Sequence, residues 1–271
     1  MIKVFQMLSL IILMYLGEIV SFAWIDTLPD PWLLSEEQFE LYLQKIENRY
    51  PDFHDRLKAI NLWRIGTPYG LYCLGEEKGR DDDPIIRYDS SDCTVHILTT
   101  IAFAQSATLE EARNRMIDIH YKADSNGIKT PNYDTRWHFT SDRILNHHMT
   151  VDITSTIAKP NKLESIDIIL NKKEDGNEFL ELGWSLKKTI NFLPYNNLDS
   201  NILSRLPSIC GVAFVKKSYF KLGIVIAHEG YLIDGKNLIH ASSEELKTVS
   251  IELLDYLNNK SFDGVMFYEI R

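Results

Sequence analysis

The chain has 271 residues, of which 45% are hydrophobic and 25% charged, and its formal net charge is −9. This is an ordinary globular composition, and the length suits one large domain or one domain with a helical extension. The negative charge argues against a nucleic-acid partner, because phosphate binding depends on Lys and Arg. Three cysteines in a chain of this length exclude a disulfide framework.

The first 23 residues have the pattern of a secretory signal peptide. An apolar core at 7–15 follows a positive charge, and Ser-Phe-Ala at 21–23 is typical of a cleavage site. An uncleaved anchor is the alternative, but Glu18 interrupts the apolar stretch, and a spanning helix needs about 20 apolar residues. We expect an exported chain that begins near Trp24, is periplasmic or secreted, and has no stable membrane insertion after leader cleavage.

Helical patterns follow the leader. The run 33–50 is opened by Ser-Glu-Glu-Gln at 35–38, a capping-box sequence that satisfies free N–H groups of a first helical turn. A second helical stretch, residues 53–63, leads into the turn Gly-Thr-Pro-Tyr-Gly at 66–70. These patterns predict two helices ahead of a proline-containing turn.

Cys93 is the strongest candidate for a catalytic residue. It follows Asp92, a good helix N-cap, and precedes the apolar run 95–103, so the thiol is expected in the first turn of a helix. The free N–H groups and the dipole of a first turn favour a thiolate, which is the nucleophilic form. The alternative for such a cysteine is a small buried hydrophobic residue.

The second half of the chain changes character. After a further helix that starts at 108–111, short runs of β-forming residues alternate with turn residues. These runs are 166–170, 211–215, 222–227, 238–241 and 265–270. Helices followed by strands predict an α+β fold.

Several motifs together resemble the NlpC-type cell-wall cysteine peptidases, and in particular their N-acetylmuramoyl-L-alanine amidase-like branch. Asp-Cys-Thr at 92–94 matches the start of the nucleophile segment, and Gly-Thr-Pro-Tyr at 66–69 matches the turn before it. Arg-Trp-His at 136–138, followed by Val-Asp-Ile-Thr at 151–154, resembles the combination that marks the amidase-like branch. Ile-His-Ala at 239–241 matches the segment of the family's second histidine.

The resemblance, from about Trp63 to Ile270, implies a papain-like NlpC-type α+β fold. In this fold, helices come first, with the nucleophile at a helix N-terminus, and pack on a mainly antiparallel sheet. The chain would then divide into a signal peptide (1–23), an N-terminal helical extension (24–62) and a papain-like amidase domain (63–271). The implied activity is hydrolysis of the N-acetylmuramoyl-L-alanine bond in peptidoglycan or muropeptide fragments, without a cofactor or metal.

The resemblance also implies roles for individual residues around the nucleophile. Tyr69 would lie beside the cysteine and help to orient the substrate carbonyl, and Asp92 would border the substrate. Arg136 and His138 would be residues of the substrate cleft, and His240 would orient the catalytic base. The plainer alternatives are a packed turn tyrosine, a surface arginine and satisfied histidines.

The family's base histidine is missing from its aligned position. It belongs to a His-Val-Gly-Ile strand, and the aligned Lys-Leu-Gly-Ile places Lys221 there. His228 follows seven residues later, at opposite strand parity and about 23 Å along an extended strand, so it is not an obvious substitute. His96 lies three residues after Cys93, a spacing at which helical side chains meet. The sequence therefore predicts His96 or Lys221 as the base, unless His96 is simply a core-edge residue.

The missing base leaves other hypotheses open. The protein could be a catalytically impaired pseudo-amidase that binds muropeptides or cell wall, or another exported thiol hydrolase or acyltransferase. Cys73 and Cys210 could form a disulfide, or all three cysteines could be reduced. No zinc site is indicated, because His147 and His148 are adjacent and point in different directions.

Overall fold

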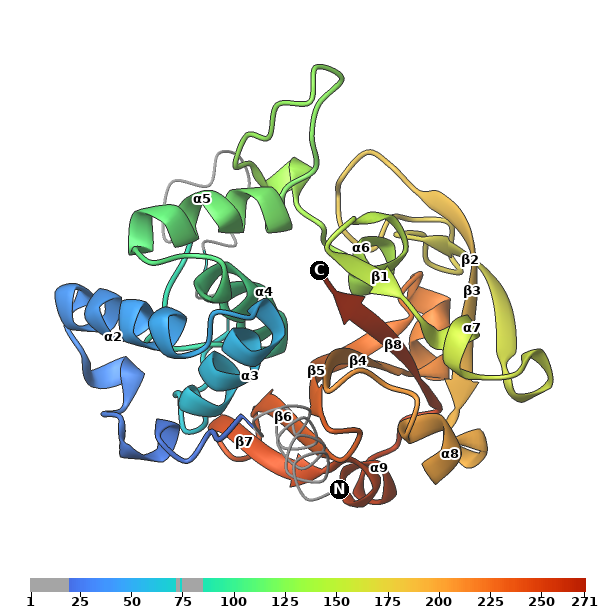
Figure 1. Ribbon diagram of the computed structural model, residues 1–271. Helices are drawn as coiled ribbons and strands as arrows, with labels where there is room; N and C mark the ends of the chain where they lie inside the picture. Colours follow the sequence, from blue (N-terminus) through green and yellow to red (C-terminus); the bar gives the residue numbers. More distant parts are fainter. Residues whose placement is uncertain (1–19, 72–73, 75–84) are drawn as a thin grey trace, which may run out of the picture.

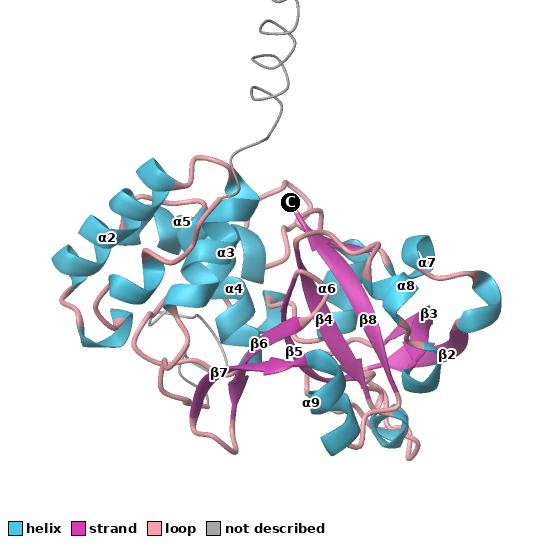
Figure 2. Ribbon diagram, turned by 60° about the horizontal axis from the view of Figure 1, so that its bottom comes forward, coloured by secondary structure: helices cyan, strands magenta, loops and turns pink. Residues whose placement is uncertain are grey.

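The computed structural model describes residues 20–71, 74 and 85–271. The first 19 residues of the predicted signal peptide, and Cys73, lie outside this range. Figure 1 shows a group of helices beside a curved sheet, and Figure 2 shows the same arrangement from another side. Within the described residues, no helix combines the length and apolar character needed to cross a membrane.

Four longer helices form one side of the molecule (Figure 1). They are α2 (Glu36–Arg49), α3 (Phe53–Trp63), α4 (Cys93–Ala104) and α5 (Leu109–His120), preceded by the 3₁₀ turns η1 (Ile25–Thr27) and η2 (Pro31–Leu33). The predicted capping box is present: Gln38 N–H donates to the Ser35 hydroxyl, and the Gln38 side chain accepts from the Ser35 N–H. The sequence patterns of this part of the chain therefore predicted its helices correctly.

The strands of the described residues form one eight-stranded sheet in which every pairing is antiparallel. The order is β2-β3-β8-β4-β5-β6-β7, and β1 pairs separately with β8. The strands are β1 (Thr150–Asp152), β2 (Glu164–Leu170), β3 (Leu186–Pro194), β4 (Ile209–Val215), β5 (Ile226–Ile233), β6 (Asn237–Ser242), β7 (Lys247–Glu252) and β8 (Gly264–Ile270). The predicted α+β architecture with helices on an antiparallel sheet is confirmed.

Shorter helical segments connect the strands. They are η3 (Tyr133–Thr135), α6 (Thr140–Asn146), α7 (Thr154–Ile157), η4 (Pro160–Lys162), η5 (Tyr195–Asn197), α8 (Ser200–Leu203), η6 (Lys217–Leu222) and α9 (Leu253–Asn259). The predicted strand at 222–227 is wrong at its start, because Leu222 ends η6 and β5 begins only at Ile226. Gly223 follows η6 with φ of +73°, and a Cβ there would lie 2.5 Å from the backbone N of Lys172. A left-handed glycine in close contact with a neighbouring backbone ends this turn instead of extending a strand.

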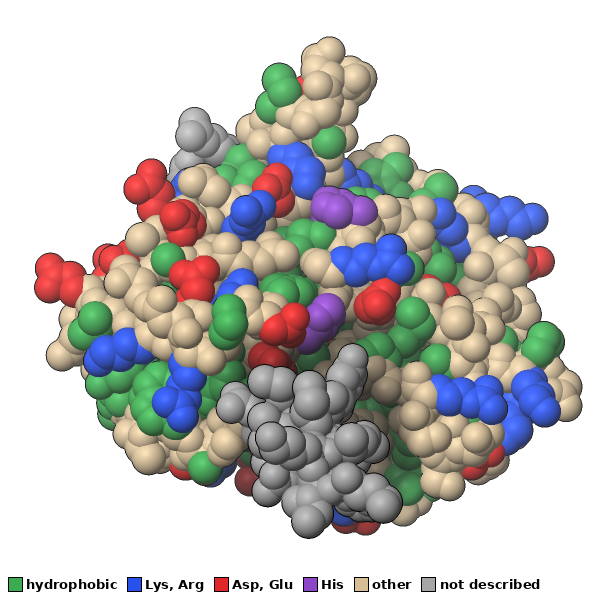
Figure 3. Space-filling model, in the orientation of Figure 1, with side chains coloured by type: hydrophobic (Ala, Val, Ile, Leu, Met, Phe, Trp, Pro, Cys, Tyr) green, Lys and Arg blue, Asp and Glu red, His purple; other side chains and the backbone are tan. Residues whose placement is uncertain are grey.

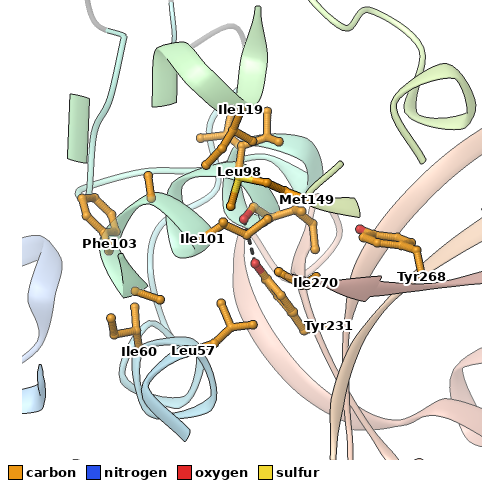
Figure 4. Packing of buried hydrophobic residues seen from close by; sticks show 14 of the residues in the cluster. Leu57, Ile60, Leu98, Ile101, Phe103, Ile119, Met149, Tyr231, Tyr268 and Ile270 are labelled. Carbon is orange, nitrogen blue, oxygen red and sulfur yellow. Dashed lines mark hydrogen bonds between the residues drawn. The ribbon is translucent and has the colours of Figure 1, made fainter. Parts of the chain in front are cut away.

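The sheet has an apolar cluster on each face. Alternate residues point to opposite faces of a strand, so Tyr231 of β5 joins the cluster with the long helices, while Leu232 joins the one with α9. Figure 4 shows Tyr231 reaching from the sheet to α4, where its hydroxyl donates to the carbonyl of Ile97 at 2.7 Å. Every residue of α4 from Val95 to Ala104 is buried. Since each large apolar side chain contributes about 1.5–3 kcal/mol, the packing holds this helix and its first turn firmly in place.

Charge is mixed over the surface that Figure 3 presents. Acidic and basic side chains are interspersed on this face, with apolar patches between them. Although the net charge is −9, this face does not form one continuous acidic surface.

Candidate active site

Cys93 is the first residue of α4, as the sequence predicts. Asp92 is the N-cap, and its side chain accepts a hydrogen bond of 2.8 Å from the N–H of Val95. The backbone N–H groups of Cys93 and Thr94 make no hydrogen bond within the described part of the chain. Two first-turn donors are thus free beside the thiol.

The thiol faces a cavity of about 220 Å³ between α4 and the sheet. Its lining, which we call the Cys93 cavity, comprises Cys93, Thr94, His138, Phe139, Thr140, Ser141, Phe179, Leu180, Ile224, Ile226, Ala227, His228 and Glu229. The cavity brings the cysteine together with two residues of β5, His228 and Glu229, that the sequence analysis did not select.

The thiol of Cys93 is neutral near pH 7. Burial of the sulfur raises the pKa of Cys93 to about 12, and the nearby carboxylates of Asp92 and Glu229 act in the same direction. Hydrogen bonds from the Glu229 backbone and the Thr94 side chain oppose this shift but are weaker. The first-turn N–H groups favour a thiolate, as expected, but the cost of desolvation at this position is larger. A nucleophilic role for this thiol would therefore require a base to remove the proton.

His228 and His240 form a hydrogen-bonded pair on adjacent strands. The distance between His228 Nε2 and His240 Nδ1 is 2.9 Å, and the ring of Tyr256 from α9 packs 4.7 Å from the His240 ring. Burial is the main cause that lowers the pKa of His228 to about 3 and that of His240 to about 4. Nδ1 of His228 has no hydrogen-bond partner among the described residues. A neutral imidazole with a free ring nitrogen therefore lines the same cavity as the thiol.

Lys221 does not lie at this cavity, so its predicted place beside the thiol is wrong. It is an exposed residue of η6 and lines a separate pocket with residues of β2 and the segment that follows. The prediction matched the family's glycine to Gly223, whereas the glycine of the strand is Gly230, two residues after His228. A Cβ at Gly230 would lie 2.9 Å from the Cβ of His240, so this glycine lets the two histidine-bearing strands approach.

His96 is also placed away from the cavity. It is fully buried, its Nε2 lies 2.9 Å from Asn61 Oδ1 on α3, and its ring meets Tyr231 edge-on at 5.8 Å. Burial lowers its pKa well below the ordinary value. Because α4 is surrounded by protein on all sides after its first turn, residue 96 faces α3 and the sheet. The structure therefore contradicts His96 as the base.

Glu229 forms a buried polar network that links the site to three other elements. Its Oε2 accepts from Arg143 Nη2 at 2.5 Å and from Tyr268 Oη at 2.7 Å, while its Oε1 accepts from the hydroxyls of Thr94 at 2.9 Å and Thr140 at 3.2 Å. The side chains of Arg143 and Glu229 are each only 1% exposed. Burial alone would lower the pKa of Arg143, but Glu229 and Tyr268 raise it above its ordinary value. The ion pair and the hydrogen bonds to Glu229 together tie α4, α6 and β8 to β5.

Of the predicted cleft residues, only His138 lines the Cys93 cavity. Its Nε2 lies 2.5 Å from the carbonyl of Tyr133, and burial lowers its pKa. Arg136 is 2% exposed, with its guanidinium 5.4 Å from the centre of the Tyr133 ring, and does not line the cavity. Its backbone pairs with Tyr121.

The turn with Tyr69 lies beside the start of α4, as expected, but its side chain does not line the cavity. Tyr69 pairs with Ser91 in an isolated bridge, and the Ser91 N–H donates to the Pro68 carbonyl at 3.0 Å. Asp92 likewise serves the helix cap and is absent from the cavity lining. These residues position the first turn of α4, and the structure does not bring them to the cavity.

The structure tests only part of the predictions about the other cysteines and about a metal site. Cys210 is a buried free thiol in β4, whereas Cys73, its possible disulfide partner, lies outside the described residues. In the ranges that the structure describes, no group of three or more His, Cys, Asp or Glu residues could hold a metal ion.

Comparison with known proteins gives a family match. Residues 60–265 match the model of the family described as AmiA-like, N-acetylmuramoyl-L-alanine amidase-like. The chain has no significant match among curated proteins. The family match covers the helices α4 and α5, the cavity and both histidines of the pair, so it includes the whole candidate site.

Several solved structures share the fold. A Legionella pneumophila protein of the family DUF1460 has 21% identity and a TM-score of 0.67, over 87% of this chain and 95% of that one. A putative xylanase from Bacteroides fragilis has 21% identity and a TM-score of 0.60, over 78% and 99%. An N-acetylmuramoyl-L-alanine amidase from Bacteroides uniformis has 19% identity and a TM-score of 0.60, over 79% and 97%. At these identities the likeness shows a common fold alone.

Proposed function

The chain belongs to the AmiA-like, N-acetylmuramoyl-L-alanine amidase-like family, and from this premise we propose that it is a cysteine amidase acting on peptidoglycan fragments. The bond cleaved is the amide between N-acetylmuramic acid and L-alanine. One observation carries the proposal: a single cavity holds the helix-terminal thiol of Cys93 and His228, which is hydrogen-bonded to His240. The fold is of the papain-like NlpC type, in which a nucleophile helix packs on an antiparallel sheet that carries the histidines.

The geometry supports the following acyl-transfer steps. His228 Nδ1 accepts the proton of the Cys93 thiol as the sulfur attacks the carbonyl carbon, because both groups start neutral. His240 accepts a hydrogen bond from the opposite nitrogen of His228, which fixes its tautomer. The free N–H groups of Cys93 and Thr94 stabilise the developing oxyanion. His228 then protonates the leaving amine, and water hydrolyses the thioester with the same histidine as base.

Export is part of the proposal. The leader pattern before Trp24 supports a chain that meets peptidoglycan in the periplasm or outside the cell. The mature protein would comprise the helical extension and the amidase domain. Sequencing the N-terminus of the exported protein tests this, and a full-length chain retained in the membrane would contradict it.

The mechanism predicts that Cys93→Ala abolishes cleavage of an N-acetylmuramoyl-L-alanyl peptide. The matched control is Cys210→Ala, since Cys210 is a buried free thiol that does not line the Cys93 cavity. Peptide release, measured by chromatography, should be lost only in the first variant, while both variants keep a cooperative thermal transition. Turnover that persists in Cys93→Ala would exclude the cysteine mechanism. Binding without cleavage by the wild-type protein would favour a muropeptide-binding module instead.

A further inference from the structure

One side of the Cys93 cavity is apolar, and three separate segments of the chain form it. We call this side the apolar wall; its residues are Phe139, Phe179, Leu180, Ile224 and Ile226. Two of them, Phe179 and Leu180, belong to the connection between β2 and β3. Within 171–185, all of which the structure describes, no helix or strand forms. The position of this part of the wall therefore depends on other contacts.

Asn171, directly after β2, holds this connection in place. It is fully buried. Its Nδ2 donates to the carbonyls of Leu180 at 3.0 Å and Trp184 at 2.7 Å, and its Oδ1 accepts from the N–H of Leu180 at 2.7 Å. The backbone carbonyl of Asn171 accepts from the N–H of Phe179 at 3.2 Å. Asn171 therefore fixes both wall residues of the connection.

An asparagine suits this position in side chain and in backbone. The two carbonyls each need a donor and the N–H of Leu180 needs an acceptor, and an amide supplies all three. A carboxylate would place an oxygen against two carbonyl oxygens and leave them without a donor, which is unfavourable in a buried site. The φ of Asn171 is +61°, a conformation that Asn adopts more readily than most residues.

Asn171 also contacts neighbours of the other two wall segments. Its N–H donates to the carbonyl of Gly223 at 3.1 Å, and Gly223 directly precedes Ile224 of the wall. Trp184, which is bound through its carbonyl, packs its ring edge-on against Phe139 at 5.6 Å. Asn171 itself does not line the cavity. Any effect of this residue on a bound molecule must therefore pass through the wall.

The apolar wall lies in the same cavity as the thiol of Cys93 and the imidazole of His228. An apolar surface cannot solvate a charge, so the part of a substrate that lies against it is uncharged. Phe179 is 40% exposed, which leaves apolar surface for a bound molecule to cover. Contact with the wall would stabilise a bound substrate without taking part in proton transfer.

We propose that Asn171 is a positioning residue that holds the apolar wall against the substrate in the Cys93 cavity. This inference rests on the proposed amidase function and adds to it a residue that lies outside the cavity. Asn171 acts on substrate binding through Phe179 and Leu180. It leaves the thiol and the proposed base unchanged.

The first test is Asn171→Gly, which removes the three side-chain hydrogen bonds but tolerates a positive φ. The KM for an N-acetylmuramoyl-L-alanyl peptide should rise about tenfold, while kcat stays within about twofold, because binding is weakened and the reacting groups are untouched. The matched control is Asp234→Gly. Asp234 also has a positive φ, +53°, and does not line the cavity, so its replacement should leave KM unchanged.

A second variant, Phe179→Ala, separates positioning from a general structural role. It should raise KM by itself. If Asn171 acts through the wall, the KM of Asn171→Gly/Phe179→Ala should be close to that of the weaker-binding single variant, because coupled residues are not additive. If thermal denaturation shows that Asn171→Gly does not fold, Asn171→Asp takes its place, since it keeps the acceptor and loses both donors.

The outcomes separate this inference from the amidase proposal. An unchanged KM in the Asn171 variant, a fall in kcat alone, or KM increases that multiply in the double variant would each overturn the positioning role. If wild type does not cleave the muropeptide, the amidase proposal fails. Alkylation of Cys93 by N-benzyliodoacetamide and by iodoacetamide, corrected with Cys93→Ala, then decides the role of Asn171. A rate preference for the benzyl reagent that is lost in Asn171→Gly supports the inference, and an equal rate ratio in both proteins refutes it.

Discussion

Two neighbouring residues on β5 show opposite ways of placing a polar group inside a protein. His228 belongs to a neutral pair, next to the aromatic rings of Phe214 and Tyr256. Glu229 faces the other way and belongs to a charged network with Arg143. The histidine that we propose as the base is neutral and partly accessible, whereas the glutamate that holds elements together accepts hydrogen bonds from Arg143, Tyr268, Thr94 and Thr140. Adjacent positions of β5 thus carry a residue proposed for catalysis, His228, and a residue that stabilises the fold, Glu229.

The largest effect on activity should come from replacing His228, the proposed base. We predict that His228→Ala lowers kcat by about 10²- to 10⁴-fold, the usual contribution of a general base. Lys221→Ala, on η6, should leave turnover unchanged. Muropeptide cleavage measured for both variants distinguishes the two candidate bases. Loss of activity in the lysine variant alone would mean that the cavity geometry has been misassigned.

Replacing Glu229, which supports the structure, should lower the free energy of unfolding. Glu229→Ala leaves the Arg143 guanidinium buried without its partner, which is expected to cost about 3–5 kcal/mol of unfolding free energy. Arg143→Met in the same chain removes the unpaired charge and should recover much of the loss. Urea denaturation of the two variants checks this. If Glu229→Ala lowers the unfolding free energy by less than about 1 kcal/mol, the buried ion pair contributes no more than an exposed one.

A smaller effect is expected in the pH dependence of stability, and it comes from the neutral histidine pair. The folded-state pKa values of His228 and His240 are lowered to about 3 and about 4, while the unfolded values are near 6.5. Below about pH 6.5 the unfolded chain takes up protons that the folded chain does not. Stability from these histidines is therefore complete above that pH and falls as pH drops toward 4, by up to about 1.4 kcal/mol per pH unit for each group.

Denaturation midpoints at pH 7, 6 and 5 measure this slope. His240→Asn should make it shallower, and His148→Asn, at an exposed position, should not. The activity profile should move in the same sense, since a base with a lowered pKa stays neutral in mild acid. If kcat/KM instead falls on the acid side with a midpoint near pH 6.5, the pKa of His228 is not lowered and this prediction is wrong.

The part of the site that the sequence predicts is the part that local rules determine. The N-cap and the apolar run after it place Cys93 in a first helical turn without reference to distant residues. The capping box of α2 is predicted for the same reason. The α+β order of elements also follows from patterns that act over a few residues.

The proposed base could not be placed by such rules. Two glycines, Gly223 and Gly230, offer alternative matches for one strand motif, and only tertiary contacts distinguish them. Gly223 ends η6 against the backbone of Lys172, whereas Gly230 lets β6 approach beside His240. Glu229 was missed because its partners come from three separate elements. A pairing of His-x-Gly with the later Ile-His-Ala strand was the available signal, since it puts both histidines on neighbouring strands.

The hydrogen bond from Thr94 to Glu229 joins residues 135 positions apart in the chain, and this separation has a kinetic consequence. Contacts between distant parts of a chain form slowly, because a long loop must close before they contribute. The α4 helix can form early, but its thiol gains a proton acceptor only when β5 has docked. Catalytic competence should therefore appear with the last phase of refolding, and recovery of turnover would time the docking of the sheet on the helices.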